Sequence, residues 1–332
     1  MLGFSIIICT YNPEFKIFKR LLNAVQSFGS EALSKCEIII VDNNSSIPLT
    51  QNIAVVEFLA SVPNAKLIRE ATPGLTNARI AGIKVAKYDW IIFFDDDNEP
   101  KLDYLIAAED ITEKHPEVGI WGPGNITVEY FERRATSFLN EMKVLFQERK
   151  MDNTVFDNDI IKGNACYPYG TGMLVRRVIL DSYIGSVNRN EYTMSDRTGQ
   201  SLISAGDTQI LYTGLKMNYY AGSSPKLQLT HVITANKLKL KYILKLIYSL
   251  HSGQIKAYNE VFYNKPHFVK PVSAKEAANP IFTFFISLRN SVDLKQNLVT
   301  LSERMGYLNA RIMAGNFSKP FFIKSWEKII GV

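Results

Sequence analysis

The first hundred residues contain short, continuous apolar runs. Polar residues do not alternate with apolar ones in these runs, as they would in a strand with one face exposed to solvent. Residues 4–9 read FSIIIC, residues 37–42 read EIIIVD and residues 90–94 read WIIFF. Strands buried on both faces have this pattern, which is typical of parallel sheets covered by helices. A shorter run at residues 65–68 predicts one more strand of the same sheet.

Helical periodicity fills the gaps between these runs. After the first run, apolar residues recur at intervals of three and four and stop at Gly29, as on one face of an amphipathic helix. They are Phe15, Phe18, Leu21, Leu22, Val25 and Phe28. Residues 77–86 continue the alternation of strand and helix. The order predicts an α/β fold, Rossmann-like, with a mostly parallel central sheet flanked by helices.

The second half of the chain has a mixed pattern that becomes helical. We predict a strand at 118–121, a helix near 136–149, a glycine-rich strand segment at 170–175, a helix that carries Asp207, and a strand at 226–230. The helical part covers residues 238–257 and about 297–314, with a proline-containing linker at 265–280. We therefore expect a domain of residues 1–235 and a helical C-terminal region of residues 236–332.

Composition places this fold in the ordinary globular class. The chain has 332 residues, of which 46% are hydrophobic and 21% charged, which suits a folded enzyme of about two domains. Three cysteines without C-x-x-C spacing argue against a disulfide framework or a thiolate zinc site and favour a reducing cytosol. We expect no signal peptide and no transmembrane span, because no run approaches roughly 18 apolar residues.

Positive charge is concentrated in one region. The net charge is +6, and the stretch from Lys226 to Lys275 holds nine lysines and a single acid, Glu260. No nucleic-acid module is recognisable, so we expect no nucleic acid and favour anionic headgroups on the cytoplasmic face of the inner membrane, or an anionic lipid carrier. Residues 237–245 alternate lysine and apolar residues as in a basic amphipathic helix, although ordinary helix packing gives the same pattern.

Three predicted strands end in polar residues that are expected to gather at one rim. Ligands of open α/β sheets bind at the carboxyl ends of the strands. The residues are Thr10, Tyr11 and Asn12 after the first strand, Asp42 after the second, and Asp95, Asp96 and Asp97 after the run at 90–94. Adjacent acids repel one another, and Mg²⁺ or Mn²⁺ with substrate phosphates compensates such a cluster. An acidic turn after a strand is the simpler alternative.

Other candidate residues have two interpretations each. Asp42 can accept the imide N–H of a uracil ring, or serve a turn or helix cap. Arg79, early in its helix, can pair with a phosphate or brace the acids, or form a surface ion pair. Trp121 can stack on a sugar or belong to the core. Gly170 and Thr171 lie where the backbone can approach a sugar, or where strands simply pack.

Several segments in order resemble the family 2 glycosyltransferases of the GT-A fold. They are SIIICTYN at residues 5–12, VDNNSS at 41–46, GLTNAR at 74–79, FFDDDN at 93–98, GTGMLVRR at 170–177 and DRTGQSLISAGDT at 196–208. The likeness covers about residues 4–235. No single segment is decisive, but their order and spacing together are specific.

The resemblance implies a role for each matching residue. Thr10, Tyr11 and Asp42 would contact the nucleoside, and Asp96 the ribose or nucleotide. Asp95 and Asp97 would form the DxD pair, with Asp97 the firmest ligand of Mn²⁺ or Mg²⁺.

Two further residues complete the implied site. Asp207 aligns with the second acid of the family's Glu-Asp motif, the catalytic base, whereas Gly206 stands where the first acid usually lies. His231 resembles the histidine that completes the metal site in many relatives. Ile80 replaces the asparagine that commonly follows the arginine.

The resemblance therefore predicts an inverting transfer of sugar from a nucleotide sugar, with UDP favoured through Asp42, to a hydroxyl of a glycan or lipid-linked saccharide in bacterial surface-polysaccharide synthesis. A sugar-1-phosphate nucleotidyltransferase would need a Gly-rich loop with Arg or Lys at residues 10–14, which the sequence lacks. A catalytically silent scaffold on the same fold would be expected to lose the DxD or base carboxylates, and both are present.

Overall fold

The computed structural model describes residues 3–160, 166–194, 196, 201–290 and 293–332. The strands are β1 (Phe4–Thr10), β2 (Cys36–Asp42), β3 (Ala65–Arg69), β4 (Trp90–Asp95), β5 (Asn98–Pro100), β6 (Val118–Tyr130), β7 (Arg149–Lys150), β8 (Val155–Asp157), β9 (Met173–Arg176) and β10 (Tyr220–Ile233). They form one sheet in the order β3-β2-β1-β4-β9-β6-β10-β5, with β7 beside β6 and β8 beside β10.

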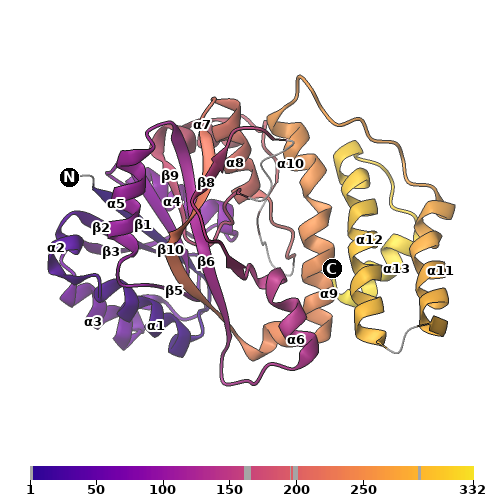
Figure 1. Cartoon of the computed structure of the whole chain (residues 1–332), viewed down its shortest axis with the longest axis horizontal. Coiled ribbons are helices and arrows are strands. Elements are labelled where there is room, and N and C mark those ends of the chain that lie inside the picture. The colour runs from indigo at the N-terminus through magenta and orange to yellow at the C-terminus, as the bar shows by residue number, and fades with distance from the viewer. Residues whose placement is uncertain (1–2, 161–165, 195, 197–200, 291–292) are drawn as a thin grey trace.

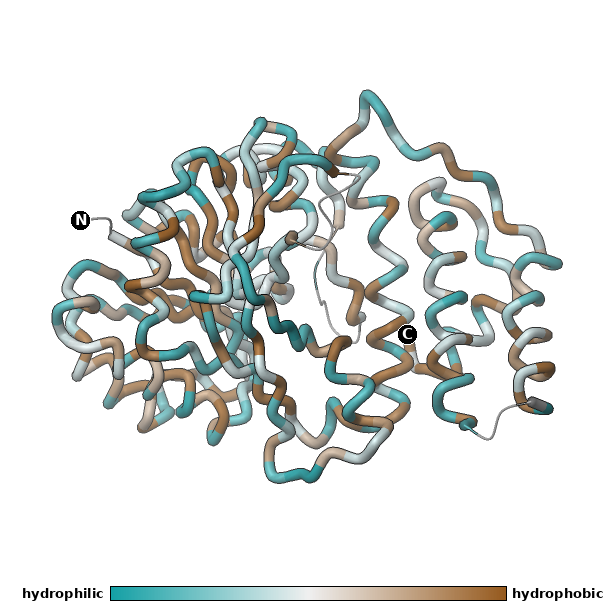
Figure 2. The backbone as a smooth tube through the Cα atoms, viewed as in Figure 1, coloured by the Kyte–Doolittle hydropathy of each residue, from teal (hydrophilic) through white to brown (hydrophobic). Residues whose placement is uncertain are grey.

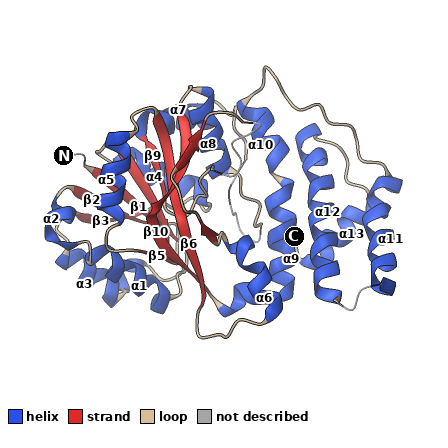
Figure 3. Cartoon of the chain, in the orientation of Figure 1, coloured by secondary structure: helices blue, strands red, loops and turns tan. Residues whose placement is uncertain are grey.

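Helices flank this sheet and form the C-terminal side of the molecule (Figures 1 and 3). They are α1 (Phe15–Gln26), α2 (Gly29–Ser34), α3 (Ile53–Ser61), α4 (Leu75–Val85), α5 (Tyr104–Lys114), α6 (Ser137–Glu141), α7 (Arg177–Asn188), α8 (Gly206–Lys216), α9 (Leu240–Ser252), α10 (Gln254–Val261), α11 (Ala274–Asn290), α12 (Leu294–Gly315) and α13 (Phe321–Ile330). Short 3₁₀ turns are η1 (Leu49–Gln51), η2 (Met142–Phe146) and η4 (Ala235–Leu238). The predicted α/β class with a helical C-terminal extension is confirmed.

The N-terminal half of the sheet is parallel, as the apolar runs predict. β1 lies between β2 and β4, with Thr10 opposite Asp42 and Cys9 opposite Asp95. Every residue of β1 and β2 is buried. Ile6 and Ile8 pack into the core on one face, and Ile7 packs into the core on the other. The strands are accordingly brown along most of their length in Figure 2.

The other half of the sheet is mixed. β9 inserts antiparallel between β4 and β6, while the long strands β6 and β10 run parallel to each other. The strands predicted at 118–121 and 226–230 lie within the longer β6 and β10. The helix predicted near 136–149 is wrong in extent: the short α6 passes into η2, and the left-handed Gln147, at φ 70°, ends the helical path.

The C-terminal helices share a core with the far ends of the sheet. Ile243, Leu244 and Ile247 of α9 are buried with Val128 and Ile233 of the two long strands. The amphipathic pattern at 237–245 is therefore explained by helix packing. The predicted helix at 238–257 is divided at Gly253 into α9 and α10, and α11 begins inside the predicted linker, with Pro280 in its interior. Within the ranges described, no helix is both long and apolar enough to cross a bilayer.

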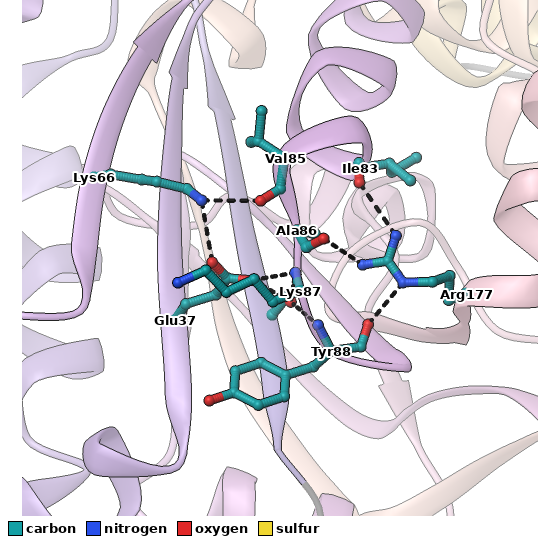
Figure 4. Close-up of polar contacts among 9 residues, drawn as sticks. Glu37, Lys66, Ile83, Val85, Ala86, Lys87, Tyr88 and Arg177 are labelled. Carbon is teal, nitrogen blue, oxygen red and sulfur yellow. Dashed lines mark hydrogen bonds and ion pairs between the residues drawn. The ribbon is translucent and has the colours of Figure 1, made fainter.

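Ion pairs and hydrogen bonds secure the end of α4 where it enters β4 (Figure 4). The carboxylate of Glu37, buried on β2, accepts hydrogen bonds from Ser5 and the backbone N–H of Lys87, and Lys66 lies 3.1 Å away. The guanidinium of Arg177 donates to the last carbonyl groups of α4 and to the carbonyl of Tyr88. These contacts fix α4, whose other end reaches the candidate site.

Candidate functional site

A cavity of about 660 Å³ opens at the carboxyl ends of β1 and β4. The sheet contributes polar groups to its wall, among them Thr10, Tyr11, Asp95, Asp96 and Asp97. The opposite wall is largely apolar and includes Phe146, Leu202 and the α9 residues Tyr242, Leu246 and Leu250. The rim predicted from the sequence is thus one side of a cavity whose other side the helical region provides.

The three acids at the end of β4 have different surroundings. Thr171 donates a hydrogen bond to Oδ2 of Asp95 at 3.1 Å, and Thr10 donates to Oδ2 of Asp96 at 2.6 Å. Burial, followed by the charge of Asp97, raises the pKa of Asp96 to about 6. Asp96 and Thr10 therefore form a hydrogen-bonded pair between the ends of β4 and β1.

Asp97 faces two cationic side chains. Burial works against its charged form, but Lys237 and His231 outweigh burial and lower the pKa of its carboxyl group well below the ordinary value. Nζ of Lys237 lies 2.6 Å from Oδ2, and Nε2 of His231 lies 3.3 Å from Oδ1. Nδ1 of His231 lies 2.8 Å from the carbonyl oxygen of Phe146, which can only accept a hydrogen bond. That bond fixes the imidazole with Nε2 toward Asp97.

The donor set of Asp97 and His231 suits a divalent cation that keeps substrate oxygens as its other ligands. A histidine whose second ring nitrogen bonds a carbonyl is the usual arrangement at metal sites. Across the part of the chain that is described, no group of three or more His, Cys, Asp or Glu side chains is arranged to hold a metal. Phosphate or water oxygens would have to complete the coordination, as is common for Mg²⁺.

The loops after β1 and β2 are tied together by their own polar residues. Asn12, left-handed at φ 48°, accepts a hydrogen bond from the backbone N–H of Ser46, and its own N–H donates to Ser45. The two carboxylate oxygens of Asp42 accept from the N–H groups of Ser45 and Leu49. Asp42 thus has the turn role that the sequence left open. Its contact with uracil, like that of Tyr11, stays a prediction.

Arg79 and Asp207 lie together beside Gly170, whose neighbour in the chain, Thr171, lines the cavity. Arg79, only 4% exposed, forms an ion pair with Asp196 at 3.2 Å. It is therefore not on the surface. A Cβ at Gly170 would lie 2.6 Å from Oδ2 of Asp207 and 3.3 Å from Nη2 of Arg79. Gly170 therefore leaves space for these two side chains, and the approach of a sugar to its backbone stays a prediction.

Trp121 does not face the cavity. Its side chain is fully buried in the core, against the rings of His115 and Phe156. The core interpretation therefore holds, and the sugar-stacking interpretation of Trp121 is wrong because no part of its ring reaches the site. Residues 197–200 of the predicted motif at 196–208 lie outside the described residues.

Two residues of the site were missed from the sequence. The alternation of lysine and apolar residues predicts a basic helix face for Lys237, although this residue lies only six positions after His231 in the sequence. Asp196 appeared only as the first residue of a motif, and nothing local to it signals its contacts with Arg79 and with α8.

Comparisons with known proteins complete the description of the site. A family model described as Glycosyl transferase family 2 matches residues 5–184. A Haemophilus influenzae protein described as an uncharacterized glycosyltransferase is 32% identical over 114 residues, which are 34% of this chain and 36% of that protein. The chain therefore matches only about a third of that relative's length.

Similar solved structures include S. aureus TarS, at 16% identity and a TM-score of 0.49, covering 95% of this chain and 91% of the other. A second TarS structure, in complex with UDP-GlcNAc, is 14% identical with a TM-score of 0.49 and covers 95% and 93%.

Proposed function

This chain belongs to glycosyl transferase family 2, and we propose that it transfers a sugar, with inversion, from a nucleotide sugar to a hydroxyl of a glycan or lipid-linked saccharide during synthesis of a bacterial surface polysaccharide. UDP is the favoured nucleotide. The observation that carries the proposal is the placement of Asp95, Asp96 and Asp97 in the wall of a cavity beside Thr10.

The donor half of the cavity suits a nucleoside diphosphate. Tyr11, 59% exposed at the end of β1, offers an aromatic face to a base. Asp97 and His231 would hold Mn²⁺ or Mg²⁺, which stabilises the negative charge of a departing diphosphate when bound. Lys237, on the same carboxylate, brings a further positive charge to this point.

Asp207 is the proposed base. It takes the proton of the acceptor hydroxyl as that oxygen bonds to the anomeric carbon and the bond from that carbon to the diphosphate breaks. A positioned base of this kind contributes about 10²–10⁴-fold to the rate. Asp207 lies in the first turn of α8 and is partly exposed, and its carboxylate lies beside Gly170, whose neighbour in the chain, Thr171, lines the cavity.

We place the protein in the cytoplasm, with a peripheral contact to the inner membrane. The surface that supports this contact is on α11 rather than α9. Phe282, Phe285 and Ile286 are 68%, 61% and 44% exposed and lie on one face of α11, with the exposed Arg289 one turn further. An apolar stripe with a cation is the pattern of interfacial helices.

Calorimetric titration with a panel of nucleoside diphosphates, with and without Mn²⁺, tests the donor site. We expect UDP to bind in the presence of Mn²⁺ and Asp97→Ala to abolish that binding. Asp152→Ala, which removes an exposed acid away from the cavity, is the matched control and should bind normally. If no nucleotide binds the unsubstituted protein, the transferase proposal fails and the silent scaffold is favoured.

A further inference from the structure

Gly206, the residue before Asp207, has no side chain, and the carboxylate of Asp196 lies directly against it. A Cβ built on Gly206, the first residue of α8, would lie 2.2 Å from Oδ2 of Asp196. No side chain could be added there without moving Asp196. Gly206 has no side chain, and the carboxylate of Asp196, ten residues earlier in the chain, occupies the space that such a side chain would need.

Asp196 is held rigidly in that space. Its side chain is completely buried. Oδ1 accepts hydrogen bonds from the backbone N–H groups of Ala205 and Gly206, at 2.6 and 2.8 Å, and Oδ2 faces Nη1 of Arg79 at 3.2 Å. A carboxylate at the N-terminus of a helix satisfies N–H groups that have no partner within the helix.

The same residue also ties α8 to α4. Its backbone N–H donates to Oγ1 of Thr76 at 3.2 Å, and its carbonyl accepts from the N–H of Leu75 at 3.2 Å. Both partners belong to the first turn of α4, and Leu75 lines the cavity. Asp196 thus connects the helix that carries the proposed base to a helix whose first turns line the cavity.

We propose that Asp196 is a positioning residue for Asp207: it supplies from a distant position the carboxylate that residue 206 lacks, and it holds Arg79 and the start of α8 in place around the base. This inference rests on the proposed transfer reaction. Asp207 and Asp95 are the other acids whose charges act on Arg79. Without Asp196, the guanidinium would therefore attract Asp207 more strongly and draw the proposed base out of position.

Relocation of the carboxylate tests this role. We would compare Asp196→Gly, Gly206→Glu and the double variant Asp196→Gly/Gly206→Glu with the unsubstituted chain, measuring kcat, KM for donor and acceptor, and UDP binding. Asp196→Gly should lower kcat by about 10²-fold, the cost of a small misplacement of a catalytic group, with little change in donor KM. Gly206→Glu alone should be as poor, because its Cβ meets Asp196. The double variant should recover most of the lost kcat.

The isosteric Asp196→Asn is the control for loss of folding, because its side-chain oxygen can still accept hydrogen bonds from the N–H groups of Ala205 and Gly206. We expect it to bind UDP normally but to have a reduced kcat, since the charge opposite Arg79 is gone. Full activity of Asp196→Asn, or a double variant no better than Asp196→Gly, would overturn the inference. An unsubstituted chain that binds no nucleotide and transfers no sugar would instead refute the proposed function.

Discussion

The ammonium group of Lys237 lies 2.6 Å from Oδ2 of Asp97, on the carboxylate whose other oxygen faces His231. A cation of the protein's own therefore occupies one side of the group proposed to bind a metal. Lys237 follows β10 in η4, so its backbone is fixed while its long side chain can move. Metal binding at Asp97 has to compete with this ammonium group.

Removal of the competing cation should strengthen metal binding. We expect Lys237→Met to raise the affinity for Mn²⁺ in the absence of nucleotide by about tenfold, or about 1.4 kcal/mol. Electron paramagnetic resonance of free Mn²⁺ during titration measures this directly. Lys239→Met, at an exposed lysine two residues on, should leave the affinity unchanged. Equal or weaker binding by Lys237→Met would show that the ammonium group does not compete.

Loss of the base should separate chemistry from binding. Asp207→Asn keeps the size of the side chain but cannot take a proton, so we expect kcat to fall by about 10²–10⁴-fold. The affinity for UDP with Mn²⁺, measured by calorimetry, should stay as in the unsubstituted protein. A variant that retains its rate would assign the proton transfer to another group.

A single methyl group at Gly170 should disturb the same base. Gly170→Ala places Cβ 2.6 Å from Oδ2 of Asp207, so the carboxylate must move, and we expect about a tenfold to hundredfold lower kcat. Gly185→Ala, within α7, is the matched control. Its Cβ would meet only the flexible end of Arg189, and alanine favours a helix, so both rate and melting temperature should be preserved or improved. Equal rates for the two variants would contradict the close packing at Gly170.

Glu37 predicts a pH dependence of stability that has nothing to do with the site. Burial alone would raise its pKa, but hydrogen bonds from Ser5 and Lys87 and the charge of Lys66 lower it overall. The stabilisation is therefore complete above the ordinary value of 4.5 and is lost as the pH falls through the lower folded value.

Glu37→Gln should consequently reduce the free energy of unfolding by about 1–3 kcal/mol at neutral pH, because a buried charged network loses one partner. The difference between the two proteins should shrink as the pH falls below 4.5 and through the lower pKa of Glu37 in the folded protein. Urea denaturation over a pH series measures both values. A constant difference at all pH values would mean that the charge of Glu37 contributes nothing.

The parallel strands could be predicted because strands buried on both faces consist of continuous apolar residues. β1, β2 and β4 are continuous apolar runs, and the polar residues that follow them inevitably meet at one rim. The glycine-rich segment at residues 170–175 predicts a strand, and β9 comprises residues 173–176, but its place between β4 and β6 depends on pairing with distant strands. Its antiparallel direction leaves no local signal.

Only those residues of the site that lie at the ends of predicted strands could be predicted from the sequence. Asp95, Asp96, Asp97, Thr10 and His231 all come at or near strand ends. The relation of Asp196 to Gly206 is steric and passes through space, so the sequence shows only a missing acid. The lysine-rich segment was ambiguous for another reason: α9 has the same amphipathic pattern whether its apolar face meets lipid or, as here, a protein core.

The position of α9 also determines the shape of the cavity. Tyr242, Leu246 and Leu250 face the cavity, while the same helix packs along α12, where Ser302 donates a hydrogen bond to the carbonyl of Leu244. The apolar wall of the cavity is therefore one surface of a helix that packs against α12 on another. Substitutions between α9 and α12 can therefore widen or narrow the cavity by changing how these two helices pack, while the carboxylates at the ends of the strands stay unchanged.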